Sequence, residues 1–66
     1  MNVKYPHIEV QLTGEDGNAF FIIGRVMKAL KRGGVEKAEV EAFSQEAMSG
    51  DYNNVLQTAM KWVSVA

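Results

Sequence analysis

Glu15 and Asp16 form an adjacent pair of carboxylates within the stretch Gly14 to Asn18. Such a pair could ligate a metal ion or act as a general acid and base. The aspartate spacing of a calcium loop does not follow it, and Gly14 and Gly17 lack the third glycine of a dinucleotide-binding turn. The two acids would also repel an anion at the start of the next helix. We therefore expect this stretch to be a turn between a strand and a helix.

The other side chains that could perform chemistry are isolated from one another. His7 is the single imidazole, there is no cysteine, and Ser44, Ser49 and Ser64 stand in no nucleophile motif. Nucleophilic catalysis needs a nucleophile and a base held together, and no such constellation is recognisable. The sequence therefore predicts a protein that is not an enzyme, with no catalytic residue, no metal site and no cofactor. His7 is expected to lie on the polar face of a strand.

The best candidate for a functional surface is one side of the helix expected to begin near residue 19. At 100° per residue, Phe21 falls about 40° from Arg25 and about 20° from Lys28. Arg32 lies on the same side, again about 20° from Phe21. Gly24 leaves room for another backbone, although glycine inside a helix costs about 0.5–1 kcal/mol relative to alanine. The candidate interaction face therefore comprises Phe21, Gly24, Arg25, Lys28 and Arg32.

This basic and aromatic face fits two kinds of partner. A protein could dock on it with Phe21 as an aromatic anchor, which is the hypothesis we favour. A nucleic acid could contact the cations with its phosphates and stack a base on Phe21, but the net charge of −1 provides no overall attraction. Alternatively, the next helix folds over Phe21 and its glutamates pair with the cations, and the face is then purely structural.

A polar face on the expected third helix resembles a helix-turn-helix reader in outline. Asparagine and glutamine can contact adenine edges, but the preceding helix is acidic and would face phosphates badly. A solvated helix face is therefore the favoured interpretation. The residues concerned are Asn53, Asn54, Gln57, Thr58 and Lys61.

Strict alternation over His7–Thr13 predicts the strand that precedes the turn. Its inward residues are expected to be Ile8, Val10 and Leu12, and Pro6 stands just before it. The period then changes to that of a helix from Ala19 to about Arg32, with Asn18 as its N-cap and Gly33–Gly34 at its end. The expected inward face of this helix comprises Ala19, Phe20, Ile22, Ile23, Val26, Met27, Ala29 and Leu30.

Two further helices are predicted. The second covers Glu36 to Met48 and has a narrow apolar stripe, which places it at the periphery; the stripe consists of Val40, Phe43 and Ala47. The third runs from Tyr52 to about Lys61, with Asp51 as its N-cap. Its expected inward residues, extended into the following segment, are Tyr52, Val55, Leu56, Ala59, Met60 and Val63.

The segment Trp62–Val65 fits either a last helical turn or a short strand. We favour the strand, because the first strand otherwise has no partner for its backbone groups. The fold class is then α+β, a small β-α-α-α-β domain. Two strands leave open edges, which favours a homodimer formed through edge pairing.

Size and composition predict a single domain over residues 1–66. A chain that is 47% apolar and 23% charged is typical of a globular protein rather than a disordered one. The apolar run Ala19–Ile23 is far shorter than the ~20 residues that cross a bilayer, and the first residues do not resemble a signal segment. We therefore expect a cytoplasmic protein with no membrane partner.

Four segments carry a resemblance to known proteins: Tyr5-Pro6-His7, Gly14-Glu15-Asp16-Gly17-Asn18-Ala19-Phe20, Gly24-Arg25-Val26 and Ser49-Gly50-Asp51-Tyr52. In these segments the chain resembles a group of small hypothetical proteins of similar length from bacteria and phages, and the second segment is the most distinctive. The resemblance covers nearly the whole chain. It implies a stand-alone domain and carries over no activity, cofactor, partner or site residue.

Overall fold

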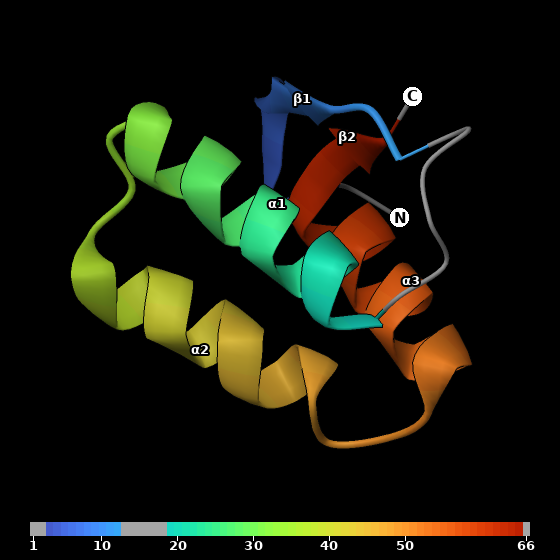
Figure 1. Ribbon diagram of the computed structural model, residues 1–66. Helices are drawn as coiled ribbons and strands as arrows, with labels where there is room; N and C mark the ends of the chain where they lie inside the picture. Colours follow the sequence, from blue (N-terminus) through green and yellow to red (C-terminus); the bar gives the residue numbers. More distant parts are fainter. Residues whose placement is uncertain (1–2, 13–18, 66) are drawn as a thin grey trace.

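The chain folds in the order strand, three helices, strand. In the computed structural model, residues 3–12 and 19–65 are described. They form β1 (Tyr5–Val10), α1 (Ala19–Arg32), α2 (Lys37–Ala47), α3 (Tyr52–Trp62) and β2 (Val63–Val65) (Figure 1). This order confirms the predicted small α+β domain. The predicted turn at residues 14–18, with Glu15, Asp16 and the Asn18 cap, lies outside the described residues.

The two strands form a parallel pair, with Tyr5 opposite Val63 and Val10 opposite Val65. The pairing is irregular between Tyr5 and Glu9. The predicted strand His7–Thr13 is displaced: β1 begins at Tyr5, contains Pro6 and ends at Val10. Pro6 falls in this irregular stretch, and proline is tolerated at such positions because it has no N–H to donate to a regular ladder. Its carbonyl accepts a hydrogen bond from the Ser64 hydroxyl at 2.8 Å.

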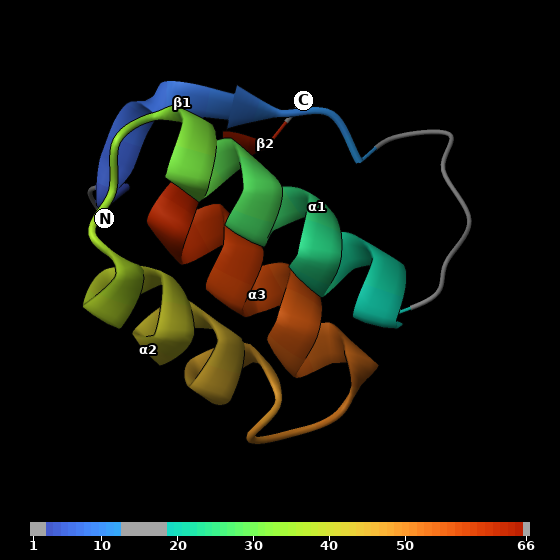
Figure 2. The ribbon, with the colours of Figure 1, turned by 60° about the vertical axis from the view of Figure 1, so that its left-hand side comes forward.

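The helices form a layer beneath this small sheet. α1 contacts β1, α3 contacts β2, and α2 packs against α1 and α3 on the side away from the strands (Figures 1 and 2). The stripe predicted for α2 is confirmed, because its three apolar residues are all buried. The buried apolar core comprises Ile8, Val10, Ile22, Ile23, Val26, Leu30, Val40, Phe43, Ala47, Val55, Ala59, Trp62 and Val63.

Several side chains lie where helical periodicity did not place them. Phe20 is 76% exposed, and Tyr52 and Met60 are also exposed, although all three were expected to face inward. Each helix buries only the part of its apolar arc that a neighbouring element covers. Thr58, expected to face solvent, is buried because it lies three residues after Val55 and shares that buried side of α3.

Trp62 ends α3 instead of beginning the last strand. Its ring meets Phe43 edge-on, with 5.6 Å between the ring centroids, and lies 6.1 Å from the Tyr5 ring. The Lys4 ammonium sits 4.2 Å from the centroid of the indole ring, within the range of a cation–π contact. The predicted strand is therefore confirmed for Val63–Val65, and Trp62 instead contributes its ring to the core.

Glu39 of α2 links the start of β1 to the helices through an ion pair and a hydrogen bond. Its carboxylate forms an ion pair with Lys4 and accepts a hydrogen bond from the Tyr5 hydroxyl at 3.2 Å. The bond from Lys4, followed by that from Tyr5, lowers the pKa of Glu39 despite partial desolvation. The same bond raises the pKa of Lys4, and desolvation followed by the bond to Glu39 raises that of Tyr5.

These shifts predict a pH-dependent contribution to stability. Because the pKa of Glu39 is lowered by folding, its contribution is present above the ordinary value of 4.5 and is lost as the pH falls through the folded pKa. Glu39→Gln should therefore lower the free energy of unfolding at pH 7, and the deficit should shrink at pH 3. Urea denaturation at both pH values measures this. An unchanged deficit, or an equal effect of Glu41→Gln on the exposed side of α2, would contradict the assignment.

Candidate functional site

The five residues of the candidate interaction face lie on α1. Phe21 is 43% exposed, Gly24, Lys28 and Arg32 are exposed, and Arg25 is half-buried. The guanidinium carbon of Arg25 lies 5.7 Å from the centroid of the Phe21 ring. An arginine at this distance from an aromatic ring is in cation–π range, which keeps the two side chains close together. α1 therefore presents an aromatic ring and three cations along one side.

Phe21 is 43% exposed, which does not fit an α2 helix folded over its ring. Within the described ranges, the α2 glutamates that form ion pairs do so with cations outside α1. Glu39 pairs with Lys4, and Glu46 lies 3.8 Å from the ammonium of Lys61. α2 packs through its own narrow apolar stripe, which directs its acids away from the basic side of α1.

An open groove lies between this basic side and β1. Its volume is about 580 Å³. Five consecutive residues of the strand region, His7 to Gln11, form one wall. The other wall is formed by Arg25, Lys28, Ala29, Arg32 and Gly33. The structure thus adds a strand wall that sequence reasoning missed, because no local pattern shows which side of a helix will lie against a strand distant in sequence.

The close approach of α1 to β1 depends on Gly33. A Cβ atom at this position would lie 2.6 Å from the Cδ1 atom of Ile8 and 3.0 Å from its Cγ1 atom. Real carbon atoms do not approach so closely without a shift of the isoleucine side chain. The absence of a side chain at Gly33 therefore lets the chain just after α1 lie against the Ile8 side chain, and both residues line the groove.

Gly24 faces open space on the same side of α1. A Cβ atom there would meet no atom within 4 Å, so packing inside the described part of the chain does not offset the cost of this glycine. Gly24→Ala should therefore raise the free energy of unfolding by about 0.5–1 kcal/mol, because alanine restricts the unfolded chain and favours the helix. Urea denaturation measures the change. A loss of stability would show that the position is sterically confined.

A second, smaller hollow of about 340 Å³ lies between the start of α1 and the α2–α3 connection. Phe20, Met48 and Tyr52 line it and are all exposed. Two consecutive phenylalanines thus reach different surfaces: Phe20 borders this apolar hollow, and Phe21 lies on the basic side of α1. The described residues that line the hollow include no cation, which separates it chemically from the groove.

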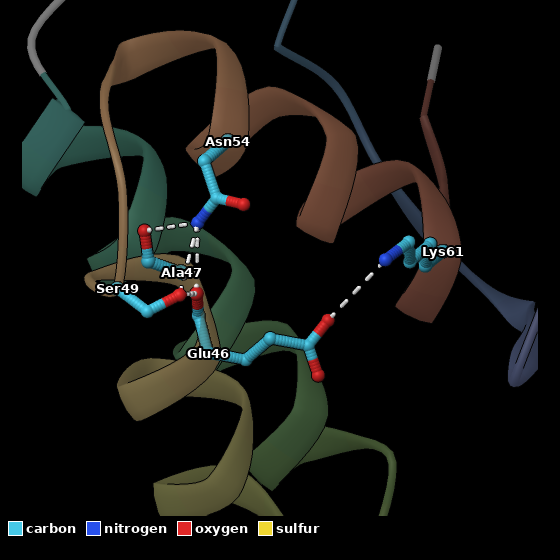
Figure 3. Close-up of polar contacts among 5 residues, drawn as sticks. All are labelled: Glu46, Ala47, Ser49, Asn54 and Lys61. Atoms are coloured by element: carbon cyan, nitrogen blue, oxygen red, sulfur yellow. Dashed lines mark hydrogen bonds and ion pairs between the residues drawn. The ribbon is translucent and has the colours of Figure 1, made fainter.

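On the polar side of α3, Asn54 and Thr58 are engaged within the fold, whereas Asn53, Gln57 and Lys61 are exposed. The Asn54 amide donates to the carbonyls of Glu46 and Ala47, at 2.9 and 3.2 Å, and to the Ser49 hydroxyl at 3.4 Å (Figure 3). The backbone N–H of Asn54 donates to the Asp51 carboxylate, which confirms the predicted N-cap. Because Thr58 is also buried, two residues of the helix-turn-helix outline are unavailable to DNA.

His7 is exposed on β1, with its ring edge-on to Tyr5 and 6.3 Å between the centroids. Within residues 3–12 and 19–65, no group of three His, Asp or Glu side chains could hold a metal ion. Over the same ranges, the helices are too short or too polar to cross a bilayer.

Comparisons with known proteins give this chain no relative. No family model, no curated protein and no solved structure matches it.

Proposed function

We propose that this chain is a small protein-binding module that acts through the candidate interaction face on α1. The observation that carries the proposal is the open groove in which Arg25, Lys28 and Arg32 face the strand wall of β1. Phe21 stands beside it as an exposed ring that can anchor a partner. A regulatory or accessory role in the cytoplasm of a bacterium or its phage fits the small size and the resemblance described above.

A nucleic acid is the alternative partner. It is supported by the four cations in the C-terminal half of α1, where Lys28, Lys31 and Arg32 form no ion pair with the described part of the chain. Against it, the groove includes Glu9, and the chain carries a net charge of −1. Binding to single-stranded or duplex DNA or RNA that weakens steeply with salt would support this alternative.

A matched pair of charge reversals on α1 tests the protein-binding proposal. Lys28 lines the groove, whereas Lys31 is exposed on the same helix outside it. Wild-type protein, Lys28→Glu and Lys31→Glu would be used as bait in extracts of the native host. We expect the wild type and Lys31→Glu to capture the same protein and Lys28→Glu to lose it, because reversing a contact charge disrupts electrostatic complementarity. Equal capture by both variants would contradict the proposal.

Phe21 provides a test that separates docking from folding. Phe21→Ser should abolish capture of the partner while lowering the free energy of unfolding by less than about 1 kcal/mol, because the ring is 43% exposed. Capture and urea denaturation would be measured on the same preparation. A large loss of stability with capture intact would show that Phe21 serves the core.

The homodimer through an open strand edge remains a separate prediction. In the two-stranded sheet of the described residues, β1 and β2 are each paired along one edge only, so the outer edge of β2 is also available for pairing with a second copy. Light scattering at high protein concentration would measure the mass of the species in solution. A monomeric mass would count against the dimer without affecting the proposed docking face.

A further inference from the structure

The groove runs along the open edge of β1. A groove on one face of a strand meets alternate residues, because successive side chains point to opposite faces. Here five consecutive residues contribute, from His7 to Gln11, including the inward Ile8 and Val10 and the outward Glu9. Both faces of a strand meet at its edge, and β2 takes the other edge in the two-stranded sheet. The groove therefore gives access to the backbone of β1 that points away from β2.

An unpaired strand edge is a template for another extended segment, because its outward N–H and C=O groups lack ladder partners. The four lining residues of β1, His7 to Val10, together with Gln11, cover about 13 Å at about 3.3 Å per step. On the opposite wall, Arg25 to Gly33 cover about 12 Å of helix axis at 1.5 Å per residue. The groove is therefore long enough for four or five extended residues between β1 and α1.

The charge of the groove selects the chemistry of that segment. Among the described residues that line it, three are cations, Arg25, Lys28 and Arg32, and one is a carboxylate, Glu9. The inward face of β1 is the one that packs on the helices, so an added strand would turn one of its two faces toward α1. Acidic side chains at alternate positions of the segment would then all face the cations.

We propose that the groove binds an extended acidic segment of a partner protein, which adds to β1 as a further strand and places alternate carboxylates against Arg25, Lys28 and Arg32. This inference rests on the proposed protein-binding function and specifies the partner's chemistry. Backbone hydrogen bonds to the edge provide affinity, and the cations provide specificity. Phe21 lies on the same side of α1 as these cations, where it can anchor the part of the partner that continues beyond the groove.

A second copy of this chain fits the groove less well than an acidic segment. If two copies of β1 paired edge to edge, each copy would offer one strand carboxylate, Glu9, to the cations of the other. The neighbouring residues His7 and Gln11 carry no carboxylate. It also brings two sets of the three cations toward each other, and like charges at an interface oppose association. An acidic partner segment supplies several carboxylates and no such repulsion.

The test is a titration of the full chain with a synthetic seven-residue peptide in which glutamate alternates with valine, followed by NMR at low salt. We expect amide shifts concentrated at residues 7–11 and 25–33, with slower hydrogen exchange in β1. Lys28→Glu should weaken binding about tenfold, whereas Lys31→Glu should change it less than about twofold. The same peptide with N-methylated backbone amides should not bind, because it cannot form the strand ladder.

Several outcomes would overturn the inference. One is equal binding of the N-methylated peptide, and another is equal binding of a peptide with lysine in place of glutamate. A third is tighter binding of a single-stranded oligonucleotide to the same amides. A fourth is a mass of two chains with β1 already protected from exchange in the absence of peptide. If the peptide fails but Lys28→Glu still loses the host protein, the proposed function stands and strand addition is wrong.

Discussion

Phe43→Ala is expected to lower the free energy of unfolding by about 3–5 kcal/mol. The side chain is fully buried in α2, and its ring meets Trp62 edge-on. Removing the ring costs its transfer free energy and leaves a cavity between the helices, which close packing cannot fill without moving their backbones. A chain of 66 residues has a free energy of unfolding of about 3–10 kcal/mol, so this substitution is expected to remove a large part of it.

Urea denaturation followed by the fluorescence of Trp62, the single tryptophan, measures this loss. Phe20→Ala is the matched control, because it removes the same ring from a position that is 76% exposed. Its expected effect is below about 1 kcal/mol. Similar losses for the two variants would show that Phe43 does not form the centre of the core.

Asn54→Asp is expected to lower the free energy of unfolding by about 1–3 kcal/mol, although it changes few atoms. The amide donates to the last carbonyls of α2. A carboxylate in its place cannot donate, so its oxygen atoms would face the carbonyl oxygens without a hydrogen bond. The new negative charge would also lie at the negative end of the α2 dipole. The effect should diminish when the carboxyl is protonated at low pH, because the neutral acid can donate one hydrogen bond.

Asn53→Asp is the control for this variant. Asn53 is exposed in the first turn of α3, where an added negative charge is neutral or stabilising by about 0.3–1 kcal/mol. Both variants would be unfolded in urea at pH 7 and at pH 3. Equal and small effects of the two variants at pH 7 would contradict the proposed role of Asn54 as the link between α2 and α3.

Local patterns in the sequence were sufficient to predict the elements. Alternation around Ile8 and Val10 indicated β1, and the 3.6-residue period with its caps indicated three helices whose ends differ from the observed ones by about one residue. Asp51 could be identified as an N-cap because capping depends on a side chain and its own next turn. The partner strand followed from the need to pair the backbone of β1, whereas its parallel direction came only from the structure.

Contacts between elements were predictable only in part, because they depend on residues distant in sequence. The period of a helix shows which residues share a side, but it does not show how far the neighbours extend over that side. For this reason Phe20 was expected inside and is exposed, and Thr58 was expected outside and is buried. The ends of β1 likewise follow the position of β2, which moved the strand to include Tyr5 and Pro6.

The candidate site divides in the same way. The sequence by itself determined that Phe21, Arg25, Lys28 and Arg32 share one side of α1, because helical geometry places residues three, four and seven apart together. Only the tertiary structure decided that β1 lies opposite these cations across a groove, and that α2 leaves Phe21 exposed. The physical reason is that a helix side is a local property of the chain, whereas a groove exists only once packing of the core has brought two distant segments together.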